Sequence, residues 1–314
     1  MQGMITNDVE AAAAVIRAGG LVGMPTETVY GLACDATSPA ALERLYAVKG
    51  RPTDHPSIVH VASLADARTW TAEWPATAEA LARRFWPGPL TLILPAGDRP
   101  DPAALGGTGT VGLRLPDSPL ALALIEAAGT GLAAPSANRF GRVSPTSALH
   151  VAEDLGRDVD LILDGGRCGI GVESTIVDLT GAAPRVLRPG AITTDMLEEA
   201  LATPLEPAGA EAPRAPGTLA AHYAPRLPVI LIDAADELAD PSSTTLIAPT
   251  RTAAQGYHAV IDAGATPAAF AERLYALLRA ADRSGAARIA VLPPEATGIG
   301  LAVRDRLLRA AASS

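Results

Sequence analysis

Short apolar runs and longer stretches with helical spacing follow one another along the first 200 residues. The short runs are rich in Val, Ile and Leu and predict buried strands. They lie at residues 21–24, 57–62, 90–96, 110–116, 131–135, 160–166 and 174–179. Apolar positions three and four apart predict helices at residues 11–19, 77–85, 118–129, 147–156 and 192–202. This order of elements predicts an α/β domain with a mixed sheet.

The periodic pattern stops at residues 203–228, where six prolines stand among few apolar positions and predict a linker. Beyond it, four strands are expected at residues 228–233, 244–249, 257–262 and 288–294, and two helices at residues 267–285 and 300–312. The sequence therefore predicts a larger domain over 1–202, a linker over 203–228 and a smaller Rossmann-like domain over 229–314. No G-x-G-x-x-G turn follows the first strand of that smaller domain, so no dinucleotide is assigned to it.

Composition narrows the class of protein. The chain has 314 residues, 48% of them hydrophobic, and no apolar run approaches the roughly 20 residues that cross a bilayer. It shows no export signal, so we expect a cytoplasmic protein without membrane contact. Acidic residues outnumber basic ones, 34 to 25, and the net charge of −9 argues against a broad nucleic-acid-binding surface. The two cysteines, Cys34 and Cys168, are interpreted as small core residues.

One lysine stands among these 25 basic residues: Lys49 is the only one, and the other 24 are arginines. A site that needs a compact ammonium does not accept the planar fork of arginine, so this lysine is a candidate functional residue. Ser38 and Pro39 are typical of a helix start, and Gly50 of a helix end. Lys49 is therefore expected at a helix end that faces a loop.

Polar stretches at strand ends and tight turns supply further candidates. They lie at residues 25–32, 49–60, 112–116, 135–145, 173–178 and 185–190. Singly, each fits an ordinary structural role, but together they hold Lys49, Arg51, Arg114 and Arg188 without an obvious set of matching carboxylates. An unpaired guanidinium inside an apolar strand is costly, so Arg114 must face a carboxylate of the protein or of a ligand. The pattern predicts a cleft that binds a polyanion.

Several familiar phosphate and metal motifs are absent from the sequence. It contains no G-x-x-x-x-G-K-[ST] loop, no G-x-S-x-G elbow and no pair of histidines at metal spacing. Side-chain cations and hydroxyls would then bind phosphates in place of backbone amides, and no protein-held metal is expected.

The ordered motifs PTETVYGL, KGRP with HPSIVHV, APSAN, STIVD and RPG resemble a YrdC-like domain. The HYAP of the linker, followed by a small α/β domain, is similar to the long, two-domain form of the L-threonylcarbamoyladenylate synthase family. The resemblance implies a nucleotidyltransferase that joins L-threonine, bicarbonate and ATP into threonylcarbamoyl-AMP and releases pyrophosphate. It also implies a step in tRNA modification at adenosine 37, with Mg²⁺ bound through the ATP phosphates and a tRNA threonylcarbamoyltransferase as recipient of the product.

The resemblance also implies roles for single residues. It places L-threonine against Thr28, His60, Arg114 and Ser174, with Ala134 lining the pocket. It places ATP against Lys49, Arg51, His55, Thr110, Ser136, Asn138, Ser144 and Arg188, with Tyr223 of the linker closing over it. Lys49 and Arg51 would be the catalytic cations, and the segment from Thr26 to Tyr30 would form the floor of the substrate cleft.

Two other hypotheses remain at this point. A YrdC-like factor could bind RNA or the ribosome without making the adenylate, and tRNA binding is compatible with either activity. A carbamoyl-transfer domain like that of hydrogenase maturation proteins is the third candidate, although their zinc-finger and acylphosphatase modules are not visible in this sequence.

Overall fold

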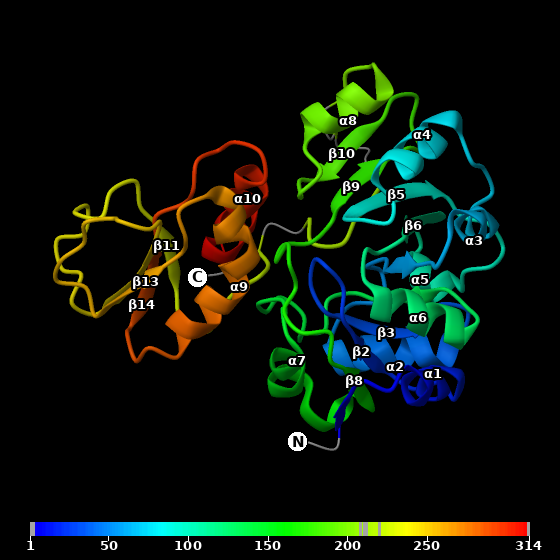
Figure 1. The fold of residues 1–314 in the computed structure, drawn as a ribbon, viewed down its shortest axis with the longest axis horizontal. Coiled ribbons are helices and arrows are strands. Elements are labelled where there is room, and N and C mark those ends of the chain that lie inside the picture. Colours follow the sequence, from blue (N-terminus) through cyan, green and yellow to red (C-terminus); the bar gives the residue numbers. More distant parts are fainter. Residues whose placement is uncertain (1–3, 207–208, 210–212, 219–220, 313–314) are drawn as a thin grey trace. The chain divides into compact units, whose positions relative to one another are not determined.

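The computed structural model describes residues 4–206, 209, 213–218 and 221–312 (Figure 1). Its contacts divide the chain into two compact units. The first unit holds residues 1–140, 145–168 and 173–218, and the second holds residues 141–144, 169–172 and 219–314. Among the described residues, no helix is long and apolar enough to cross a membrane.

The first unit is built on a mixed sheet with the strand order β1-β8-β2-β3-β7-β4-β6-β5-β9-β10. Its strands are β1 (Ile5–Thr6), β2 (Val22–Met24), β3 (Gly31–Asp35), β4 (Ile58–His60), β5 (Leu90–Pro95), β6 (Thr110–Arg114), β7 (Leu132–Ala133), β8 (Leu161–Leu163), β9 (Thr175–Asp178) and β10 (Arg185–Arg188). Strands β4 and β6 are parallel, as are β5 and β9, whereas β5 and β6 are antiparallel. The predicted mixed α/β sheet is confirmed.

The helices of the first unit are α1 (Val9–Arg17), α2 (Pro39–Lys49), α3 (Leu64–Ala67), α4 (Ala76–Phe85), α5 (Pro102–Leu105), α6 (Pro119–Ala128), α7 (Ala148–Leu155) and α8 (Thr194–Leu201). The longer helices begin and end close to the predicted positions, whereas the four-residue helices α3 and α5 were not predicted. Helix α2 starts as predicted, because the Ser38 side chain accepts a hydrogen bond from the Ala41 amide. It ends at Gly50, whose φ of 61° is left-handed and favours glycine. In Figure 1, α1, α2 and α6 lie beside β2 and β3.

Strand β3 was not predicted, since the sequence suggested a loop after residues 21–24. Instead β2 and β3 form an antiparallel pair in which Val22 faces Ala33 and Met24 faces Gly31. A Cβ at Gly31 would lie 3.0 Å from the Cβ of Ala134, so only glycine lets the two segments approach this closely. Several residues of this strand are small and have little β propensity, so the sequence does not predict it. It becomes a strand because it pairs with its neighbours in the folded protein.

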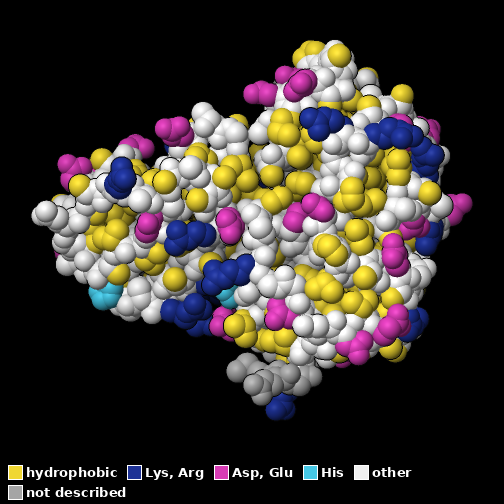
Figure 2. Space-filling model, in the orientation of Figure 1, with side chains coloured by type: hydrophobic (Ala, Val, Ile, Leu, Met, Phe, Trp, Pro, Cys, Tyr) yellow, Lys and Arg dark blue, Asp and Glu magenta, His cyan; other side chains and the backbone are white. Residues whose placement is uncertain are grey.

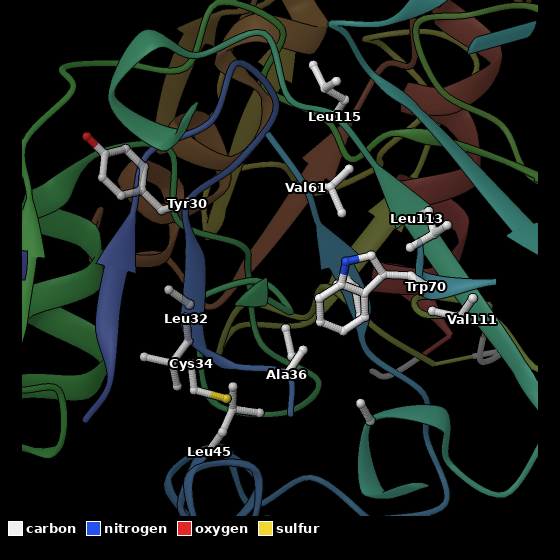
Figure 3. Packing of buried hydrophobic residues seen from close by; sticks show 14 of the residues in the cluster. Tyr30, Leu32, Cys34, Ala36, Leu45, Val61, Trp70, Val111, Leu113 and Leu115 are labelled. Carbon is white, nitrogen blue, oxygen red and sulfur yellow. The ribbon is translucent and has the colours of Figure 1, made fainter. Parts of the chain in front are cut away.

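The larger core cluster of the first unit lies on one face of its sheet (Figure 3), and a second cluster packs α1 and α6 against the other face at β2, β3 and β8. Alternate residues of three neighbouring strands are buried there: Val59, Leu92, Leu94, Val111 and Leu113. Figure 3 also shows Leu32 and Cys34 of β3, Leu45 of α2 and Trp70 in this cluster. Because side chains alternate between the faces of a sheet, the residues in between lie on the opposite face. That opposite face carries Ile58, His60, Thr91, Ile93, Thr110 and Arg114.

The second unit has a smaller sheet with four described strands, all parallel, in the order β11-β14-β12-β13. Its elements are β11 (Val229–Leu231), β12 (Thr244–Ala248), β13 (Ala259–Asp262), α9 (Pro267–Asp282), β14 (Arg288–Val291) and α10 (Gly300–Ala311). The predicted parallel sheet and both predicted helices are confirmed. Within the described residues, the two connections that join β11, β12 and β13 contain no helix.

Candidate active site

Polar side chains gather on the sheet face opposite the core, where β4, β6, β5 and β9 are consecutive neighbours. His60 lies beside Arg114 in the register of β4 and β6. Thr91 of β5 contacts Ser174, which precedes β9, with 2.8 Å between the two hydroxyl oxygens. Thr110 shares the face with Arg114, four residues later on the same strand. Sheet topology therefore brings together residues that lie far apart in the sequence.

The guanidinium of Arg114 makes three contacts at the end of β6. Its Nη1 donates to Thr28 Oγ1 at 2.9 Å, and its Nε donates to the Gly88 carbonyl at 3.3 Å. Its Nη2 pairs with Glu27 Oε1 at 2.6 Å. The sequence left open whether a protein or a ligand carboxylate would face Arg114, and the structure supplies Glu27. The expectation that these cations lack matching carboxylates is therefore wrong for Arg114.

The loop before β3 divides into a part that faces the site and a part that belongs to the core. The Oγ1 atoms of Thr26 and Thr28 lie 2.9 Å apart, and Thr28 accepts the bond from Arg114. Tyr30 instead is fully buried in the core (Figure 3). Its hydroxyl donates to the Gly166 carbonyl at 2.8 Å and accepts from the Gly165 amide at 3.0 Å. The predicted cleft floor thus ends before Tyr30.

The Tyr30→Phe variant tests this structural role. We expect it to lose roughly 1–3 kcal/mol of stability, because two hydrogen bonds that each contribute about 0.5–1.5 kcal/mol are lost. The measurement is urea unfolding followed by tryptophan fluorescence, which reports the first unit alone, since the three tryptophans are Trp70, Trp74 and Trp86. Tyr257→Phe is the control, because its hydroxyl donates to Ala235 in the second unit. Equal, small effects of both variants would contradict the assignment.

His60 is a neutral imidazole at neutral pH. Its side chain is 3% exposed, and burial together with the charge of Arg114 lowers its pKa to about 3. Its Nδ1 is buried and has no hydrogen-bond partner among the described residues. A neutral ring with an unused nitrogen can bind a hydroxyl or amine of a ligand, which suits the implied threonine contact.

Lys49 is buried at the C-terminal end of α2, which the sequence placed beside a loop. Its ammonium donates to the carbonyls of Ser136 and Asn138, the latter at 2.7 Å. Burial and the neighbouring Arg51 hold the pKa of Lys49 well below its usual value. The structure thus joins three of the predicted ATP residues, and it does so partly through backbone carbonyls rather than side chains.

Arg51 and His55 lie in the loop between α2 and β4. Arg51 Nη2 donates to the Pro56 carbonyl at 2.6 Å, and the His55 ring meets Phe140 edge to face at 5.6 Å between centroids. Burial, and next the charge of Arg51, lower the pKa of His55. The two side chains therefore share one electrostatic environment.

Arg188 ends β10 and ties two segments of the first unit together. It donates to the backbone carbonyl and the hydroxyl of Ser174, both at 3.1 Å, and to the Pro216 carbonyl at 2.7 Å. Pro216 belongs to the predicted linker, and the neighbouring Ala215 packs into an apolar cluster on the site face of the sheet. The other members of this cluster are Ile58, Ile93, Ile176 and Leu187. Residues 213–218 thus cover part of that face.

Two predicted ATP residues, Ser144 and Tyr223, belong to the second unit by their contacts. Tyr223 has a left-handed φ of 63° and is almost fully buried. Its ring stacks on Tyr275 at 5.7 Å between centroids, and the guanidinium of Arg306 lies 5.5 Å from its centroid. The packing of Tyr223 against Tyr275 and Arg306 was not predicted from the sequence.

The sequence analysis gave two residues of the site no role of their own: Glu27, which lay within the predicted cleft floor, and Thr91, which was not singled out. Glu27 stands between Thr26 and Thr28, and its signal was a lone carboxylate between two apolar runs. Thr91 interrupts an apolar strand, where alternation places it on the face away from the core. The ion pair with Arg114 assigns Glu27 to the site, and strand pairing together with the contact to Ser174 assigns Thr91.

The donor groups of the site suit anions better than metal ions. Among the described residues, no group of three His, Cys, Asp or Glu could hold a metal ion. Cys34 and Cys168 are both buried and free, as expected of core residues. On the face shown in Figure 2, basic side chains lie among acidic and hydrophobic ones.

Family models match both parts of the chain. A model described as Telomere recombination matches residues 14–190, and a model described as Threonylcarbamoyl-AMP synthase, C-terminal domain, matches residues 192–312. Together they define a two-domain enzyme of the nucleotidyltransferase type. Curated threonylcarbamoyl-AMP synthases extend this over the full chain. The one from Pyrococcus abyssi is 40% identical over 96% of this chain and 93% of its own length.

Further matches lead to the same family. The Bacillus subtilis threonylcarbamoyl-AMP synthase is 40% identical over 98% of this chain and 94% of its own length. The crystal structure of P. abyssi Sua5 complexed with L-threonine superposes with a TM-score of 0.91 at 38% identity, covering 97% of this chain and 94% of that one. This chain belongs to the threonylcarbamoyl-AMP synthase family.

Proposed function

We propose that this enzyme joins L-threonine, bicarbonate and ATP into threonylcarbamoyl-AMP and releases pyrophosphate. The observation that carries the proposal is the sheet face on which Arg114, His60 and Ser174 meet, because it offers a cation and neutral polar groups to one small ligand. The family supports the same reaction, and the solved P. abyssi relative is a complex with L-threonine.

The threonine subsite would use the residues that the sequence indicated. Arg114 is suited to a carboxylate, because its guanidinium binds planar oxygen pairs. The neutral imidazole of His60 and the hydroxyls of Thr28 and Ser174 would bind the remaining polar groups of the substrate. Ala134 is 6% exposed and small enough to leave room for the methyl group.

The ATP subsite would be formed by the remaining predicted residues. Lys49, Arg51 and Arg188 would share the triphosphate charge, and the hydroxyl and amide groups would complete the contacts. These polar groups belong to Thr110, Ser136 and Asn138, and His55 would contact the nucleotide through its ring. The ATP roles that the resemblance implies for Ser144 and Tyr223 stay predictions, since both belong to the second unit. ATP would bring Mg²⁺ on its phosphates.

The chemistry would proceed in two steps. The threonine ammonium first loses a proton to solvent, the resulting amine attacks bicarbonate, and water leaves, which gives a carbamate. A carbamate oxygen then attacks the α-phosphorus of ATP, and pyrophosphate leaves with its charge. Since the carbamate and ATP are both anions, Lys49 and Arg51 would offset their repulsion and stabilise the leaving group. Positioning would supply much of the remaining acceleration.

The linker would act as a cover for the nucleotide. Its residues 213–218 contact the first unit, where Pro216 accepts from Arg188 and Arg214 pairs with Asp54 at 2.7 Å. These contacts favour a role in closing the site and not merely in joining domains. The adenylate would then pass to a transferase that modifies adenosine 37 of tRNA.

The RNA-binding alternative is not favoured, because the net charge is −9 and the full-length relatives are synthases. The deciding measurement is pyrophosphate release from ATP by the purified chain, with L-threonine and bicarbonate each present or omitted. We expect release to require both, and L-serine to be the poorer substrate because it lacks the methyl group that Ala134 accommodates. If the chain binds ATP but releases no pyrophosphate in response to threonine, the RNA-binding hypothesis becomes the favoured one.

A further inference from the structure

Three neighbouring side chains of the threonine subsite have unused hydrogen-bonding groups. Both carboxylate oxygens of Glu27, Nη2 of Arg114 and Nδ1 of His60 are buried, and among the described residues none has a hydrogen-bond partner. Glu27 and Arg114 still attract one another, since Oε1 and Nη2 lie 2.6 Å apart. The pair is therefore held by charge, with its directional hydrogen-bonding capacity unused.

A buried ion pair of this kind costs folding free energy, so a purely structural role explains it poorly. Removing a carboxylate and a guanidinium from water costs several kcal/mol per ion, and the attraction offsets this only when further hydrogen bonds satisfy both groups. Arg114 has two such bonds, to Thr28 and Gly88, but Glu27 has none among the described residues. The unsatisfied member is thus the carboxylate, and a donor from outside the protein would complete it.

Position supports the same conclusion. Glu27 precedes Thr28 in the β2–β3 loop, and its carboxylate reaches the end of β6, where Arg114 lies beside His60. The three groups present an anion, a cation and a neutral imidazole at one place. A free α-amino acid carries an ammonium and a carboxylate on one carbon atom, and threonine adds a hydroxyl on the next. The charges of the protein and of this ligand are complementary.

We propose that Glu27 binds the α-ammonium group of L-threonine while Arg114 binds its α-carboxylate. This inference rests on the proposed function and adds to it a residue that selects α-amino acids over acids lacking the amine. Glu27 would also orient the α-nitrogen of threonine, which reacts with bicarbonate in the proposed first step. An acid without the amine would instead leave Glu27 without a donor and bring a second negative charge beside it, so the site rejects it.

The test compares the binding of two ligands to the full-length chain by calorimetry. L-threonine is one, and (R)-3-hydroxybutyrate, which keeps the carboxylate and hydroxyl but lacks the amine, is the other. We expect Glu27→Gln to weaken threonine binding roughly 10- to 100-fold, the weight of one hydrogen bond to a charged group. Binding of hydroxybutyrate should stay the same or tighten, because the repelling charge is gone. The KM for threonine should rise while the KM for ATP stays unchanged.

Glu79→Gln is the matched control, since Glu79 also pairs with an arginine, Arg68, at 2.6 Å in the first unit. It should leave both affinities unchanged. If Glu27 only holds Arg114 in place, Glu27→Gln will weaken both ligands alike, and this overturns the inference. Failure of the proposed function looks different: the wild-type chain would then show no threonine-dependent pyrophosphate release. ATP binding by each variant confirms that it is folded.

Discussion

Replacing Lys49 by alanine is expected to lower threonine-dependent pyrophosphate release by at least about 100-fold, the usual cost of losing one group that stabilises developing charge. The ammonium is the one lysine of the chain, and it is buried beside Arg51. Arginine should not replace it, because the planar guanidinium is too large for a position between the carbonyls of Ser136 and Asn138. Both Lys49→Ala and Lys49→Arg should therefore be inactive.

The structure adds a stability cost to this variant. Lys49→Ala leaves the carbonyls of Ser136 and Asn138 without their donor, so we expect a loss of roughly 1–3 kcal/mol. Arg44→Ala is the control on the same helix, since Arg44 forms a partly exposed pair with Asp160 that contributes about 0–1 kcal/mol. Pyrophosphate release and urea unfolding are measured on each purified variant. Near-normal turnover of either Lys49 variant would refute its role in ATP binding.

Replacing Arg114 by methionine is expected to abolish activity and destabilise the first unit together. The variant leaves the Glu27 carboxylate buried without its counter-charge, which costs roughly 3–5 kcal/mol. Activity should fall by at least about 100-fold, because no other group is placed to bind the substrate carboxylate through two charged hydrogen bonds. Tryptophan fluorescence during urea unfolding reports the first unit, and pyrophosphate release reports the activity.

A second substitution separates the two effects. Combining Arg114→Met with Glu27→Gln removes the unpaired charge, so we expect stability to recover by a few kcal/mol while activity stays lost. If Arg114 served only to support the fold, activity would recover along with stability to the level of the Glu27→Gln single variant. A double variant as unstable as the single one would show instead that Glu27 and Arg114 do not depend on one another.

The sequence allowed much of the fold to be predicted, because the signals involved are local. Ser38 and Gly50 define the ends of α2 through capping geometry, which depends on a few neighbouring residues. Apolar runs located most strands of both sheets. Strand β3 was not predicted, because Gly31 and its small neighbours have no strong preference for β structure. They form a strand only by pairing with β2 and β7.

The candidate site shows the same division. Ordered motifs pointed to Lys49 and Arg114, and the need of a buried arginine for a carboxylate followed from electrostatics alone. The sequence did not indicate which carboxylate would pair with Arg114. Glu27 follows β2, whereas Arg114 ends β6, and β3, β7 and β4 lie between these two strands in the sheet. The burial of Tyr30 in the core, two residues after Thr28, was equally hidden.

The sequence by itself therefore determined the element types, the two-domain order and the chemical character of the site, since each of these depends on residue type and short-range spacing. Only the tertiary structure decided which side chains meet. Strand pairing set His60 beside Arg114 and Thr91 against Ser174, and folding of the β2–β3 loop set Glu27 on the guanidinium. Contacts of this kind join residues far apart in the chain, and no local pattern encodes their partners.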